Sequence, residues 1–181
     1  HSLRLSGEAC DGVRLHPFCT RSYLEDVVMK RIEEGMAKTG RTRETFEITG
    51  GGFLATGETD EEVDKIAEWV RYRIAFYGST PSYWPVFEHH GHGDLGRKLN
   101  KMTKEGKWDQ IAAEIPDDVL HDFAAIARYD QLQTAVEKRF GGAADAIYAS
   151  TSQDIRPAIP AEVLQDMARI PTAFQGFSKH W

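Results

Sequence analysis

Residues 12–18 read GVRLHPF and follow Asp11, so an Asp-Gly turn signal precedes a short apolar segment. This pattern predicts a strand that enters a loop at His16 and Pro17. A helix is expected next, over residues 22–40. Ser22 and Glu25 have the spacing of a capping box, and Gly40 is a plausible stop. The apolar residues that would share one face of this helix are Leu24, Val27, Val28, Ile32 and Met36.

The same order of strand and helix then repeats. Residues 46–57, FEITGGGFLATG, predict a second strand, in which the run of glycines at 50–52 indicates a bulge or a close approach of backbone. Thr59 and Glu62 form another capping box, and Gly78 ends the helix that follows. Its buried side is predicted to carry Val63, Ile66, Val70, Ile74 and Tyr77.

The alternation breaks beyond Gly78. Residues 79–115 form a mostly helical insertion, with a short helix from Asp94, as its N-cap, to Glu105. Pro116 suits the first turn of a helix over residues 116–127, and Asp130 can cap another that ends before Gly141. Residues 144–150, ADAIYAS, predict the third strand, and residues 160–170 predict one amphipathic helix in the tail.

These elements predict the α/β class, with parallel strands joined by crossover helices. A TIM (β/α)8 barrel typically has eight such units in about 250 residues. The sequence offers three strands, so the predicted fold is the C-terminal part of such a barrel, with about three β/α units. We expect the partial barrel over residues 1–150 and a separate tail over residues 151–181.

Composition limits the classes of function. The chain has 181 residues, 41% of them hydrophobic, which is enough to bury a sizeable core. A net charge of -6 with scattered basic residues disfavours binding to nucleic acid or anionic lipid. Cys10 and Cys19 have no recurrent spacing and are expected to stay reduced. No apolar run approaches the ~18 residues of a membrane span, and no signal peptide opens the chain, so we expect a cytoplasmic protein without membrane contact.

The residues also carry a family resemblance. LSGEACDGVRLHPF, at 5–18, resembles the stretch LAGEVADGVLLHPF of bacterial luciferase-like oxidoreductases. Residues 31–63 and 71–96 continue the resemblance, which runs from about Leu3 to Ala149 and falls on the C-terminal portion of such proteins. It implies a TIM barrel that uses a reduced flavin or the deazaflavin coenzyme. It also implies that catalysis needs early strands outside this portion, including the catalytic base, so no catalytic residue is assigned here.

The resemblance implies two groups of cofactor contacts. Ser2 and Leu3 lie at a helix start that resembles the family's phosphate-binding element, where backbone N–H groups and a hydroxyl receive the phosphate. His16 and Pro17 end the matched strand, where the family's flavin ring lies. The alternatives are an ordinary first helical turn for Ser2 and a polar residue at the barrel rim for His16. The implied cofactor is the deazaflavin coenzyme or FMN.

The insertion supplies a candidate substrate lid. Tyr83, Trp84 and Phe87 are the aromatic residues that would cover an apolar substrate, although aromatic residues in a long insertion more often bury themselves. The substrate itself is a small molecule that the sequence does not identify.

A run of histidines, FEHHGHGDLG at 87–96, raises the alternative of a metal site. A zinc site needs three or four converging ligands with supporting hydrogen bonds, whereas the adjacent His89 and His90 tend to point apart. The resemblance matches His90 and Asp94 but not His89 or His92. A structural loop is therefore expected, with a substrate-side lid as the alternative and no metal.

One departure from the family pattern and two hypotheses remain. Family members commonly have a Gly-Ser/Thr-Pro turn before the last helix, where this chain has residues 127–130, ARYD, so a cofactor contact through that glycine is in doubt.

In the first hypothesis the chain is part of an oxidoreductase or monooxygenase completed by the missing barrel half or a second chain. In the second it is a non-catalytic remnant that acts through self-association or partner binding. Open strand edges favour a homo-oligomer in either case.

Overall fold

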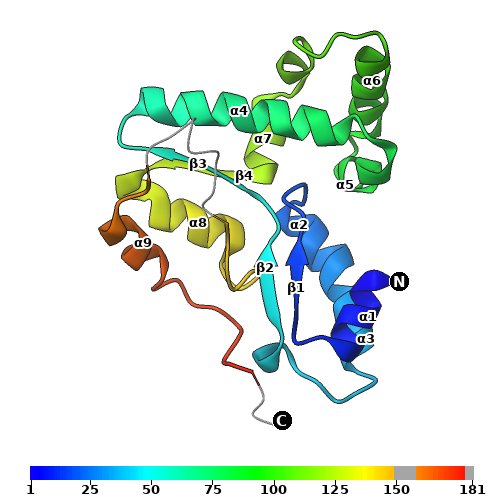
Figure 1. Cartoon of the computed structure of the whole chain (residues 1–181), viewed down its shortest axis with the longest axis vertical. Helices are drawn as coiled ribbons and strands as arrows, with labels where there is room; N and C mark the ends of the chain where they lie inside the picture. The colour runs from blue at the N-terminus through cyan, green and yellow to red at the C-terminus, as the bar shows by residue number, and fades with distance from the viewer. Residues whose placement is uncertain (149–157, 178–181) are drawn as a thin grey trace.

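The computed structural model describes residues 1–148 and 158–177 (Figure 1). In this part of the chain the strands form two parallel pairs. β1 (Gly12–Leu15) pairs with β2 (Glu47–Gly50), with Val13 opposite Ile48. β3 (Phe53–Gly57) pairs with β4 (Ala124–Arg128). The expected α/β class with parallel strands is therefore confirmed, whereas the barrel itself remains a prediction.

In the sequence, one helix precedes β1 and another follows it. α1 (Ser2–Ala9) precedes it. The helix after it comprises α2 (Arg21–Tyr23), a π-helical segment (Leu24–Met29) and α3 (Lys30–Met36). The predicted cap at Ser22 is wrong, because the Thr20 side chain accepts the Tyr23 N–H at 3.2 Å and starts the helix two residues earlier. α3 also ends before Gly40, which lies in the turn that follows.

The predicted strand over residues 46–57 is divided into β2 and β3. Gly50 and Gly51 both have φ of +90°, a left-handed conformation that interrupts the extended backbone. On its other side β2 meets the described part of the third predicted strand, residues 144–148, through a parallel bridge between Thr49 and Ala146. Ala149 and Ser150 lie outside the described residues.

The second predicted helix is confirmed at both ends. α4 (Asp60–Gly78) begins with the capping box of Thr59 and Glu62. The insertion then contributes a 3-10 turn (Pro81–Tyr83), α5 (Trp84–His89), α6 (Gly93–Lys104) and a second 3-10 turn (Ile111–Glu114). Asp94 is not the N-cap of α6. It lies inside the first turn, where its carboxylate accepts from Arg97 at 3.0 Å.

The helix predicted over residues 116–127 is wrong in its last four residues, because α7 (Asp117–Phe123) gives way to β4. Asp130 does not cap the next helix either. It lies in a 3-10 turn (Tyr129–Gln131) before α8 (Leu132–Phe140). In the tail, α9 (Ala161–Met167) forms as predicted and packs against α8.

The β3–β4 pair lies between α4 and α8 (Figure 1). Its two faces belong to two apolar clusters, because neighbouring strand residues point to opposite sides. Phe53 and Ala55 join the α4 cluster, which includes Ile66, Val70, Ile74, Phe87 and Phe123. Leu54 joins the α8 cluster, which includes Ile32, Ile48, Leu132 and Phe140. Among the described residues, no helix combines the length and the apolar character needed to cross a bilayer.

Candidate functional site

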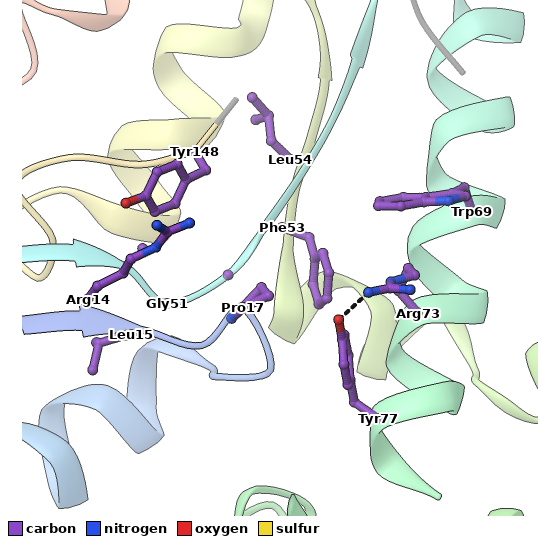
Figure 2. A pocket seen from close by; sticks show the side chains of 12 residues that line it. Arg14, Leu15, Pro17, Gly51, Phe53, Leu54, Trp69, Arg73, Tyr77 and Tyr148 are labelled. Atoms are coloured by element: carbon purple, nitrogen blue, oxygen red, sulfur yellow. Dashed lines mark hydrogen bonds between the residues drawn. The ribbon is translucent and has the colours of Figure 1, made fainter. Parts of the chain in front are cut away.

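A pocket of about 370 Å³ opens where β1 and β2 end (Figure 2). Leu15 and Gly50 are the last residues of these two parallel strands. The turn through residues 50–52 and the start of β3 line the pocket as well, and α4 forms the facing wall. Its lining residues are Arg14, Leu15, Pro17, Gly50, Gly51, Gly52, Phe53, Leu54, Trp69, Arg73, Tyr77 and Tyr148.

Glycine is required beside β1. A Cβ atom on Gly50 would lie 2.8 Å from the Leu15 carbonyl oxygen, and the φ of Gly50 is left-handed. The Gly50 N–H donates to the Ala146 carbonyl at 2.8 Å. Two neighbouring segments thus hold this turn, which exposes bare backbone toward the pocket. The sequence interpretation of the glycine run as a close backbone approach agrees with this geometry.

Three side chains at four-residue spacing form the α4 wall. Trp69, Arg73 and Tyr77 lie one turn apart on the same face of the helix, and Figure 2 shows all three pointing toward the pocket. Arg73 donates a hydrogen bond to the Tyr77 hydroxyl. Its guanidinium carbon lies 4.7 Å from the centre of the Tyr77 ring and 5.6 Å from that of Trp69.

His16 lies beside this wall but is not among the lining residues. Its ring is 4.5 Å from the Tyr77 ring and 4.9 Å from the Tyr83 ring, measured between centroids. Its Nδ1 accepts the Phe18 N–H at 3.0 Å, which leaves Nε2 to donate toward the Tyr83 hydroxyl at 3.3 Å. Burial, and secondarily the Arg73 cation, lowers the pKa of His16. The imidazole is therefore neutral at neutral pH.

The other predicted cofactor residues are split between two places. Pro17 lines the pocket. Ser2 and Leu3 line a separate hollow of about 380 Å³, together with His1, Arg4, Val27 and Arg31. The two hollows share no lining residue, so the structure does not bring Ser2 and Leu3 together with His16 and Pro17.

The three predicted lid residues also differ in placement. Tyr83 is partly exposed and touches His16. Trp84 is tied to the end of α4, since its indole N–H donates to the Gly78 carbonyl at 3.1 Å. Phe87 is fully buried and packs against Phe18 and Phe123. Its side chain belongs to the core and leaves no surface for a substrate in this chain.

The histidine run contributes one tightly held side chain. The Nε2 of His90 lies 2.7 Å from the Thr20 hydroxyl and 3.3 Å from that of Ser22, and its Nδ1 lies 3.3 Å from the Asp122 carboxylate. His89 lies 3.5 Å from Asp26. These contacts tie the loop to α2 and α7. Over the ranges that the structure describes, no cluster of three or more histidine, cysteine or acidic side chains is suited to a metal ion.

Comparison with known proteins adds the family. The sequence model of luciferase-like monooxygenases matches residues 1–145. The chain belongs to this family.

Relatives of this luciferase-like chain include proteins of known and unknown activity. An uncharacterised protein of Mycobacterium tuberculosis is 36% identical over 168 residues, which is 91% of this chain and 48% of the relative. A 5,10-methylenetetrahydromethanopterin reductase of Archaeoglobus fulgidus is 27% identical over 129 residues, which is 67% of this chain and 36% of the relative.

A solved structure shows the same fold. The coenzyme F420-dependent tetrahydromethanopterin reductase of Methanopyrus kandleri matches with a TM-score of 0.68 at 16% identity, over 93% of this chain and 46% of that one. The luciferase-like chain thus spans about half the length of the Mycobacterium tuberculosis relative and of the Methanopyrus kandleri reductase.

Sequence reasoning missed most of the pocket of this luciferase-like chain. Arg14, Trp69, Arg73 and Tyr148 were not singled out, although all four line it. The available signal was the four-residue spacing of Trp69, Arg73 and Tyr77, at the edge of the apolar stripe of α4. Arg14 and Tyr148 carried no such signal, because only the fold places them together, with the Arg14 guanidinium 4.1 Å above the Tyr148 ring.

Proposed function

We propose that the chain is the C-terminal part of an oxidoreductase that uses the deazaflavin coenzyme F420 or FMN, and that the pocket at the ends of β1 and β2 receives cofactor or substrate. The observation that carries the proposal is the position of this pocket. In α/β folds with parallel strands, ligands bind beyond the carboxyl ends of the strands. Family membership and the names of two similar reductases support the same class of reaction.

The residues present fit a planar ring. The bare backbone of Gly51 and the ring of Pro17 offer a flat surface, and Trp69 and Tyr77 face it from α4. When bound, a flavin or deazaflavin would supply hydride transfer. The chain's own residues would orient the ring and exclude water from one side. The neutral His16, held by Tyr83 and the Phe18 backbone, is a proton donor or acceptor beside the pocket.

The remaining parts of the proposal concern the intact protein. Ser2 and Leu3 would receive a cofactor phosphate, and Tyr83 and Trp84 would border the substrate, a small molecule. The catalytic base would come from a missing barrel half or a second chain, and association with further copies would cover open strand edges.

Cofactor titration tests the proposal. FMN and coenzyme F420 are titrated, with their own fluorescence as the signal, into this chain and into the longer protein that includes the family's N-terminal half. We expect weak or undetectable binding by the chain alone and measurable binding by the longer protein. In the latter, His16→Ala should weaken binding about tenfold, whereas the control His89→Ala should change it little.

Two outcomes contradict the proposal. If neither cofactor bound the longer protein, the assignment to this cofactor class would be wrong. If His16→Ala bound the cofactor as tightly as the parent, the role of His16 would be wrong. Absence of cofactor binding together with a solution mass above 20.4 kDa would favour the non-catalytic, self-associating alternative.

A further inference from the structure

Arg73 is a cation in an aromatic setting. Its guanidinium carbon lies 4.7, 5.5 and 5.6 Å from the ring centres of Tyr77, Phe76 and Trp69. The side chain is half-buried, and its Nε is fully buried without a hydrogen-bond partner. Among the described residues, no carboxylate lies within ion-pair distance of Arg73. Its one hydrogen bond in that part of the chain goes to the Tyr77 hydroxyl.

A neighbouring arginine on the same helix has an ordinary environment. Arg71 pairs with Glu68 at 2.9 Å and with Asp117 at 2.6 Å. Carboxylates are therefore available around α4, but they lie on the side that Arg71 occupies. Removing a guanidinium from water without a partner anion is unfavourable, and a charge-assisted bond to a carboxylate or phosphate offsets that cost. The Arg73 guanidinium thus has N–H groups that could donate to a bound anion.

A second cation lies across the pocket. Figure 2 shows Arg14 on the β1 side and Arg73 on the α4 side, with Pro17 and Gly51 between them. Arg14 is stacked on Tyr148 and has no ion pair within the described ranges. The described residues that line the pocket include two arginines and no aspartate or glutamate, in a chain whose net charge is -6. The local field therefore has the opposite sign to that of the whole chain, which favours negatively charged ligands.

We propose that this pocket is a binding site for an organic anion, with a carboxylate or phosphate held by Arg73 and a planar body lying against Trp69 and Phe53. Arg14 adds long-range attraction at the mouth. The identification of this anion as substrate or cofactor rests on the proposed function, whereas anion binding itself does not. The acid group could belong to either molecule, and the chemistry that recognises it is the same.

A matched pair of probes tests the charge requirement. 2-Naphthoate and its neutral isostere 2-naphthamide are titrated into the chain by isothermal calorimetry. We expect naphthoate to bind about tenfold more tightly than naphthamide, because the charged group adds a charge-assisted bond, and inorganic phosphate to compete with it. Equal affinities, or no binding of naphthoate at millimolar concentration, would overturn the proposal.

Variants locate the site. Arg73→Gln should weaken naphthoate binding about tenfold and leave naphthamide unaffected, and Arg73→Lys should restore part of the loss. Lys65→Gln removes one positive charge from an exposed position of the same helix and is the matched control. Circular dichroism confirms that each variant folds. If Lys65→Gln weakened binding as much as Arg73→Gln, the effect would be one of net charge and the site would be wrong.

A last titration separates the two sources of the anion. The longer protein is saturated with FMN or coenzyme F420 before naphthoate is added. Loss of naphthoate binding would assign the site to the cofactor's acid group, and retention would assign it to a substrate acid. Charge-dependent naphthoate binding without any cofactor binding would uphold the anion site and overturn the proposed function. Cofactor binding without charge-dependent naphthoate binding would overturn the anion site and leave the proposed function standing.

Discussion

Cys19 shows how burial controls the chemistry of a single residue. The residue is 5% exposed, and its thiol donates to the Thr20 carbonyl at 3.5 Å. Burial raises the pKa of Cys19 to about 11, although the nearby Arg139 cation acts in the opposite direction. The thiolate is the reactive form of cysteine. Cys19 is therefore inert near neutral pH, whereas Cys10 is exposed.

Thiol titration checks this difference. With a chromogenic disulfide reagent at about pH 8, we expect Cys10 to react rapidly and Cys19 to react only as the protein opens. The Cys10→Ser variant should lose the fast phase, and denaturant should make Cys19 reactive. Two equally fast thiols in the native parent would contradict the assignment.

His90 couples the fold to pH. Burial is the main cause that lowers its pKa, with His89, His92 and Arg139 acting in the same direction and Asp122 against them. The folded protein thus favours the neutral imidazole, which is the form held between Thr20, Ser22 and Asp122. As pH falls below the ordinary histidine pKa of about 6.5, the unfolded chain takes up the proton first, so stability falls.

Urea unfolding at several pH values tests the sign. The free energy of unfolding should be lower at about pH 5.5 than at about pH 7.5, and His90→Gln should make this difference smaller. His121→Gln is the control, because His121 is exposed on α7. Part of the pH dependence should remain in His90→Gln, since the pKa of His16 is lowered as well. An unchanged pH dependence in His90→Gln would rule out the proposed coupling.

At the scale of elements, α1 and α3 are held in unusually close contact. Gly7 and Gly35 lie where the two backbones meet, and a Cβ on Gly35 would be 2.0 Å from the Arg4 carbonyl oxygen. A carbonyl of α1 cannot move away without moving the helix. Glycine is therefore required at this crossing, despite its cost in helix propensity of about 1 kcal/mol.

Gly35→Ala should accordingly destabilise the protein. Overpacking typically costs about 1–3 kcal/mol, which outweighs the gain in helix propensity. Chemical denaturation measures the change in the free energy of unfolding. Glu33→Ala, at an exposed position of α3, is the control and should be close to neutral. A Gly35→Ala protein as stable as the parent would mean that the two helices can separate freely.

Helices whose ends depend on nearby residues could be predicted from the sequence, whereas strands that depend on pairing with a distant strand could not. The capping box of Thr59 and Glu62 gave the start of α4, because both partners lie within one turn. Residues 124–127, AAIA, favour a helix by composition, yet they form β4 because β3 lies beside them. That partner is some 70 residues away in the sequence, and a strand preference that depends on its neighbours is not visible locally.

The residues of the candidate site also fall into those that local sequence predicts and those that only the folded chain brings together. Pro17 was predictable because it follows directly from the end of a strand. Arg73 was not, because its lack of a carboxylate partner depends on where Glu68 and Asp117 lie in the folded chain. Arg14 and Tyr148 come together because residues 145 and 146 pair with β2, through the Thr49–Ala146 bridge and the hydrogen bond from the Ile48 N–H to Asp145. A pocket assembled from distant segments leaves little trace in any one of them.

For the whole molecule, the β3–β4 pair has a thermodynamic consequence. Each of its faces covers one apolar cluster, so loss of the α4 cluster would expose the sheet that supports the α8 cluster. The two clusters therefore share a wall and should melt together. Calorimetry should show one transition, with equal calorimetric and van't Hoff enthalpies. Ile66→Ala in one cluster and Leu132→Ala in the other should each lower the midpoint temperature of that one transition. Two separable transitions in either variant would show that the β3–β4 pair stays folded after one of the two clusters has unfolded.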